Sequence, residues 1–138
     1  MGIEVGPAPG WLRQLADAKA AYQELFGWPV SVAVGERNLV VALGRVVDAV
    51  TMPAVLGAKV LAQLGVPVPV VANSEGTRWT FFAKPAAPIV DDLSEVDLAP
   101  AGSYAVIPPE MGDWVEKPRP NRVLPSADAV VDAARLAS

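Results

Sequence analysis

The chain has 138 residues and a net charge of −4, and 52% of its residues are hydrophobic while 19% are charged. This length suits one domain over residues 1–138, and this composition excludes an intrinsically disordered chain. The sequence contains no Cys and no His, which excludes disulfides, thiolate nucleophiles, the Ser-His-Asp triad and most transition-metal sites. Any catalysis would therefore have to rely on carboxylates.

Apolar runs and charge balance constrain the location and the partners of the chain. The longest apolar runs, 46–50 and 66–72, fall short of the roughly 18 residues of a membrane helix. The N-terminal segment lacks the basic and apolar regions of a secretory signal, so we expect a cytoplasmic protein that does not bind membranes. Acidic side chains outnumber basic ones by 15 to 11, which weakens any interaction with nucleic acid because Lys and Arg supply most of that affinity.

The first part of the chain predicts a helix and a β-hairpin. Apolar residues recur at helical spacing over 11–26, and Gly27 follows as a C-terminal stop. The alternating valines in 28–34 and the apolar run 39–43 flank a turn at 35–38, a pattern typical of two paired strands.

The next segment predicts a third strand, a helix and an edge strand. After the extended run 46–50, Thr51 is expected to cap a helix that holds Pro53 in its first turn and ends at Gly65. The β-branched run 66–72 is interrupted by prolines, which confines it to a sheet edge or to the start of a strand.

The rest of the chain predicts a turn at 73–76, short strands and a final helix, with an acidic stretch at 91–97. Strands are expected at 78–82, 104–107 and 114–116. Ser126 is expected to cap a final helix that runs to Leu136. This order of elements predicts an α+β fold with a mostly antiparallel sheet and helices packed on it.

Three segments, taken in their order along the chain, resemble a known protein family. They are Gly27–Val30 with Gly44–Thr51, then Asn73–Phe82, then Val96–Pro109. In this order they are similar to the bifunctional primase/polymerase N-terminal domain of the archaeo-eukaryotic primase superfamily, in particular to its small stand-alone members. The resemblance implies an RRM-like core in which acidic residues hold two divalent metals, Mg²⁺ or Mn²⁺. These metals would support in-line nucleotidyl transfer, and a Ser/Gly turn and a His would position the nucleotide.

The same resemblance implies a degenerate catalytic site. Asp48 matches the first acid of the family's paired-acid motif, but the second position falls on Val50 or, at a shifted spacing, on Thr51. Asp97 matches the acid that precedes the glycine-rich turn, and the family's His falls on Trp79. Asp48 and Asp97 therefore remain as the candidate catalytic acids and metal ligands, and we expect no cofactor to be required.

Two of these segments have alternative interpretations. Ser74, Gly76 and Arg78 are candidates for a phosphate or nucleotide site built from backbone N–H groups and a guanidinium. They also suit an ordinary hairpin turn, and Glu75 would repel a phosphate. Asp48 likewise suits a strand-end acid that hydrogen-bonds the loop after it.

Aromatic and basic residues are candidates for contact with nucleic acid or with a partner. Trp79 and Phe81 alternate on one face of a strand, where they would stack on bases if exposed and belong to the core if helices cover them. Lys117, Arg119 and Arg122 form the basic cluster of the sequence, which suits a phosphate or an acidic partner, with a solvated loop as the alternative.

The leading hypothesis is a degenerate primase/polymerase-like domain that serves as a binding or regulatory module through a protein partner or self-association. The first alternative is an active metal-dependent nucleotidyltransferase that adds Glu36, Glu75 or Glu110 to the two aspartates. The second is a single-stranded nucleic-acid-binding protein that uses the aromatic and basic residues named above, against the acidic balance of the chain.

Overall fold

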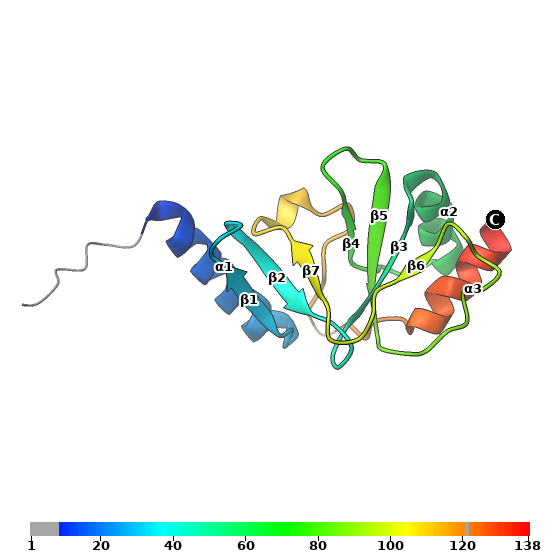
Figure 1. Cartoon of the computed structure of the whole chain (residues 1–138), viewed down its shortest axis with the longest axis horizontal. Helices are drawn as coiled ribbons and strands as arrows, with labels where there is room; N and C mark the ends of the chain where they lie inside the picture. Colours follow the sequence, from blue (N-terminus) through cyan, green and yellow to red (C-terminus); the bar gives the residue numbers. More distant parts are fainter. Residues whose placement is uncertain (1–8, 121) are drawn as a thin grey trace, which may run out of the picture.

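The computed structural model describes residues 9–120 and 122–138 and has the predicted α+β fold with antiparallel sheets (Figure 1). No helix in these residues is both long enough and apolar enough to cross a membrane. In chain order the elements are α1 (Gly10–Phe26), β1 (Val30–Ala33), β2 (Asn38–Ala42), β3 (Asp48–Pro53), α2 (Ala54–Leu64), β4 (Val70–Ala72), β5 (Arg78–Ala83), β6 (Asp97–Leu98), β7 (Tyr104–Ile107), the 3₁₀ turn η1 (Met111–Asp113) and α3 (Ala127–Ala137).

The strands form two separate sheets rather than one. The first sheet has the order β1-β2-β7, so the late strand β7 pairs with the early hairpin, and Val40 lies opposite Val106. The second sheet has the order β4-β5-β3-β6, in which Thr51 of β3 lies opposite Thr80 on one side and Asp97 on the other. Both sheets thus combine strands that are distant in the sequence.

Two hydrophobic cores lie on opposite faces of the second sheet. Helices α2 and α3 cover one face, where Val50, Met52 and Phe81 are buried (Figure 1). On the other face, Phe82 belongs to the core that α1 and the first sheet share. Successive side chains of a strand point to opposite faces, so the neighbouring residues Phe81 and Phe82 of β5 enter different cores.

Three of the predicted helix ends are confirmed. Gly27 and Gly65 adopt the left-handed conformation at the ends of α1 and α2, with φ values of 69° and 66°. The Ser126 hydroxyl accepts a hydrogen bond from the Ala129 N–H at 3.2 Å and so caps α3. These are local features, and they form as the local sequence indicates.

The start of α2 differs from the prediction. Thr51 does not cap the helix but lies inside β3, whose pairing with β5 continues to Pro53 opposite Arg78. The helix begins at Ala54, and Pro53 takes the N-cap position without a side-chain hydrogen bond. The reason is tertiary, because the backbone pairing with β5 and the contact between the Thr51 and Thr80 hydroxyls hold this segment in the sheet.

The strand predicted at 114–116 is also wrong. Met111–Asp113 form a 3₁₀ turn, and Glu116 makes only an isolated bridge to Val70 of β4. Trp114 points inward instead, because its indole N–H donates a hydrogen bond to the Tyr22 hydroxyl in the core.

Candidate functional site

A groove of about 700 Å³ lies between the two sheets, and we call it the inter-sheet groove. Its size falls in the range of small-molecule sites. Strands β2 and β7 supply one wall, and β3, β4 and β5 supply the other. The polar residues that line it are Asn38, Thr51, Asn73, Ser74, Arg78, Thr80, Tyr104 and Asp113.

Two hydroxyl groups meet in the inter-sheet groove. Thr51 and Thr80 are cross-strand partners on β3 and β5, and their Oγ1 atoms lie 3.0 Å apart. A hydroxyl both donates and accepts hydrogen bonds and carries no charge. This pair therefore offers hydrogen bonds to a ligand but little attraction for a divalent cation.

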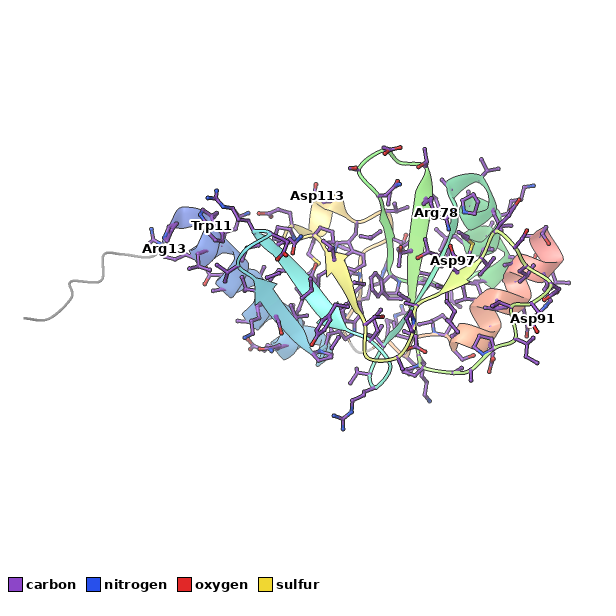
Figure 2. All side chains as sticks on the ribbon, in the orientation of Figure 1. Trp11, Arg13, Arg78, Asp91, Asp97 and Asp113 are labelled. Atoms are coloured by element: carbon purple, nitrogen blue, oxygen red, sulfur yellow. The ribbon has the colours of Figure 1, made fainter. Side chains whose placement is uncertain are left out.

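An ion pair lies beside the hydroxyl pair. The Arg78 guanidinium donates to Asp97 Oδ2 at 2.9 Å, and the two residues come from β5 and β6 on either side of β3 (Figure 2). The Asp97 side chain is 76% exposed. Its charge is compensated by the arginine, so the structure provides Asp97 with a cation from the protein itself.

The structure does not bring the two predicted metal ligands together. Asp48 has the same strand parity as Val50 and Met52, which face the core under α2 and α3. Asp97 lies opposite Thr51, which faces the inter-sheet groove on the other side of the sheet. The two carboxylates therefore lie on opposite faces of the sheet, an arrangement that does not suit a metal ion shared by Asp48 and Asp97.

Asp48 is a buried acid without a full set of partners. The residue is 7% exposed, and its Oδ1 atom has no hydrogen-bond partner in the described part of the chain. The acids considered as a third ligand, Glu36, Glu75 and Glu110, do not line the inter-sheet groove. Among residues 9–120 and 122–138, no three Asp, Glu, His or Cys residues gather closely enough to hold a metal ion.

The predicted phosphate cradle at 73–78 is a hairpin turn. The Gly76 N–H donates to the Asn73 carbonyl at 3.0 Å, and the N–H groups of Thr77 and Arg78 donate to Asn73 Oδ1 at 2.9 and 3.1 Å. These donors are used within the turn, so they are not free to hold a phosphate. Ser74 and Arg78 line the inter-sheet groove, whereas Gly76 does not.

The predicted aromatic platform is part of the core. Phe81 is fully buried under α2 and α3, so its ring is closed to a nucleic-acid base and its predicted contact is wrong for the folded chain. Trp79 packs on the backbone of α2 at Gly57, where a Cβ atom would come within 2.8 Å of the Trp79 ring atom Cε3. Helices cover this face, which is the structural alternative that the sequence left open.

The basic cluster lies away from the inter-sheet groove. Lys117, Arg119 and Arg122 line a second, smaller hollow beside the end of α1. Arg119 donates to Glu116 Oε1 at 3.1 Å. The structure therefore separates the basic residues from Ser74 and Arg78, which the sequence had suggested as a phosphate site.

Most of the residues that line the groove are not among the predicted site residues. Thr80, Asn38, Asn73, Tyr104 and Asp113 were not predicted as site residues, and the groove brings them together from both sheets and from the loops beside them. The sequence signal that could have identified such a residue is a polar side chain inside an otherwise apolar strand, such as Thr80 between Trp79 and Phe81.

No family model, no curated protein and no solved structure matches this chain.

Proposed function

We propose that this chain is a primase/polymerase-like domain with an RRM-like core that binds a nucleoside or nucleotide in the inter-sheet groove without processing it. It would act as a binding or regulatory module toward a protein partner. The observation that carries the proposal is the pair of Thr51 and Thr80 hydroxyls, 3.0 Å apart. Two-metal nucleotidyl transfer needs carboxylates that converge on the ions, whereas neutral hydroxyls support binding by hydrogen bonds alone.

The position of Thr51 links the groove to the family resemblance. At the shifted spacing of the small members, Thr51 stands at the second acid of the paired-acid motif, and Asp97 stands at the later acid. The two residues are cross-strand neighbours on β3 and β6. A site in which Thr replaces one acid and Arg78 neutralises another supports retained binding with lost catalysis.

The lining of the groove favours a ligand with hydroxyl and amide groups and with little negative charge. Asn38 lines the groove, and its buried Oδ1 has no partner among the described residues, so it can accept an N–H from a base. Arg78 is the only cation among the described lining residues, and Asp97 already bonds it, while Asp113 adds a carboxylate. This charge balance disfavours a triphosphate and favours a nucleoside or a monophosphate.

Isothermal titration calorimetry tests this proposal with the deoxynucleosides, their 5′-monophosphates and their 5′-triphosphates, each with and without Mn²⁺. We expect binding of nucleosides or monophosphates that does not need the metal. Thr80→Val removes one hydroxyl from the groove and should weaken binding about fivefold, since one hydrogen bond contributes about 1 kcal/mol. Ser31→Ala is the matched control, because it removes an exposed hydroxyl on β1 outside the groove lining.

Two outcomes contradict the proposal. Binding of triphosphates only, dependent on Mn²⁺ and lost in Asp97→Asn, would favour the nucleotidyltransferase alternative. An absence of heat with every compound would show that the groove does not take nucleotides, and the protein partner would then remain the sole proposed function.

A further inference from the structure

A second hollow of about 340 Å³ lies at the end of α1, and we call it the basic groove. Its charged lining consists of Lys117, Arg119 and Arg122, and its apolar lining includes Phe26 and Trp28. No Asp or Glu belongs to the described lining. The basic groove shares no lining residue with the inter-sheet groove, so it is an independent site.

The basic groove is a positive area on a negatively charged protein. The chain has 15 acidic and 11 basic side chains, so apart from these three cations it carries 8 basic against 15 acidic groups. Arg119 is paired with Glu116, whereas Lys117 and Arg122 have no carboxylate within 4.0 Å in the described part of the chain. Two cations are therefore available to a ligand at a place lined by apolar side chains.

Exposed apolar side chains frame the basic groove. Leu25, Val46 and Val123 line it and are 49%, 46% and 88% exposed. Large apolar side chains that are exposed together beside a hollow are typical of a contact with another molecule. Pro118 and Pro120 restrict the backbone of the basic segment, which reduces the conformational entropy lost when a ligand binds.

We propose that the basic groove binds a short acidic peptide segment of a partner protein. One large apolar side chain of the peptide packs against Phe26, Trp28 and the prolines that line the groove, which are Pro67, Pro69 and Pro118. The carboxylates of the peptide pair with Lys117 and Arg122. A long nucleic acid fits less well, because its phosphates continue past the groove onto a surface with an excess of acidic groups. A short peptide carries only a few charges past the groove and so meets little of that acidic surface.

Fluorescence anisotropy with labelled hexapeptides tests this proposal. The probes carry Leu, Phe or Trp among Asp and Glu residues, and the control probes replace the apolar residue with Ser or the acids with Lys. We expect binding of the acidic apolar peptides that weakens at least tenfold in the double variant Lys117→Glu/Arg122→Glu. Arg13→Glu/Lys59→Glu makes the same change of net charge at exposed cations outside the groove and should change the affinity less than about twofold.

A neutral variant and an NMR measurement locate the site. Val123→Ser leaves the charge unchanged and should weaken binding severalfold, because it removes an apolar side chain that is 88% exposed and does not support the fold. Amide and indole shifts in ¹⁵N spectra should change around Trp28 and 117–124 and not around Thr51 and Thr80.

Three results would overturn the proposal. The first is no binding tighter than about 1 mM by any acidic apolar peptide. The second is an equal loss of affinity in the two double variants, which would indicate net charge rather than a site. The third is tighter binding of a single-stranded oligonucleotide of equal charge, which would assign the groove to nucleic acid.

Discussion

The Trp114 indole N–H donates a hydrogen bond of 2.7 Å to the hydroxyl of Tyr22, which lies 92 residues earlier in the chain. The Tyr22 hydroxyl in turn donates to the carbonyl oxygen of Pro108, directly after β7. Tyr22 also stacks on Trp28, with ring centroids 6.1 Å apart. These contacts tie α1 to the segment that ends β7, and they hold one wall of the inter-sheet groove in place.

Replacing Tyr22 tests this connection. Tyr22→Phe keeps the ring but leaves the Trp114 N–H and the Pro108 carbonyl without their partner in the core. We expect the free energy of unfolding in urea to fall by about 1–3 kcal/mol. Tyr104→Phe is the matched control, because Tyr104 is 64% exposed, and it should change the stability by less than about 0.5 kcal/mol.

Tyr22 also predicts a loss of stability at alkaline pH. Burial raises the pKa of Tyr22 from 10.0 to about 12, although the hydrogen bond from Trp114 acts in the opposite direction. The folded state therefore holds the phenol proton more tightly than the unfolded chain, so this stabilisation is complete below pH 10 and is lost as the pH rises toward 12. Urea unfolding between pH 9 and about 12 should show this decline in the native protein.

The control for the alkaline decline is the same measurement on Tyr22→Phe. This variant has no phenol at position 22, so its stability should fall less steeply over that pH range. An identical slope in both proteins would mean that another group causes the alkaline loss.

The contact between α2 and β5 predicts that a very small substitution is harmful. A Cβ atom at Gly57 would come within 2.8 Å of the Trp79 ring, so Gly57→Ala forces the ring or the helix to shift. Overpacking of this kind costs about 1–3 kcal/mol, which exceeds the gain of about 1 kcal/mol from the helix propensity of Ala. Gly10→Ala at the start of α1, where an added Cβ atom would meet no neighbouring side chain or backbone within 4 Å, should not destabilise the protein in the same urea assay.

Neutralising the Asp48 side chain is expected to stabilise the folded chain. Its carboxylate is buried, and Oδ1 has no hydrogen-bond partner among the described residues. Because a buried oxygen atom without a hydrogen-bond partner is unfavourable, and more so on a charged group than on a neutral one, Asp48→Asn should raise the free energy of unfolding by about 1 kcal/mol at pH 7. Asp97→Asn, which breaks an exposed pair, should have an effect below about 1 kcal/mol. A large loss of stability in Asp48→Asn would show that the carboxylate makes an essential contact.

Arg135 predicts a local effect at the acidic segment. It donates to Asp92 Oδ2 at 2.9 Å, to Asp132 Oδ1 at 2.7 Å and to the carbonyl oxygen of Ile89, and the bond from Arg135 lowers the pKa of Asp92. Arg135→Gln should raise the pKa of Asp92 toward its ordinary value in an NMR titration and speed amide exchange at 89–93. Asp132→Asn keeps the bond to Asp92 and should leave that pKa low.

Local chemistry determined a large part of this fold. The glycine stops at Gly27 and Gly65 and the Ser126 cap need only their neighbours in sequence, and the early hairpin follows from alternating valines around a short turn. The composition by itself likewise excludes cysteine and histidine chemistry. These features are short-range or compositional, so propensity, periodicity and residue counts suffice to predict them.

The pairing of strands that are distant in the sequence determined which residues line the candidate site. Thr51 has the local signature of a helix cap, but its strand partners Thr80 and Asp97 hold it in β3 and turn it toward the inter-sheet groove. The register of β3 also places Asp48 on the opposite face of the sheet from Asp97. A strand's two faces are equivalent until distant segments cover one of them, so no local pattern reveals which side chains will meet.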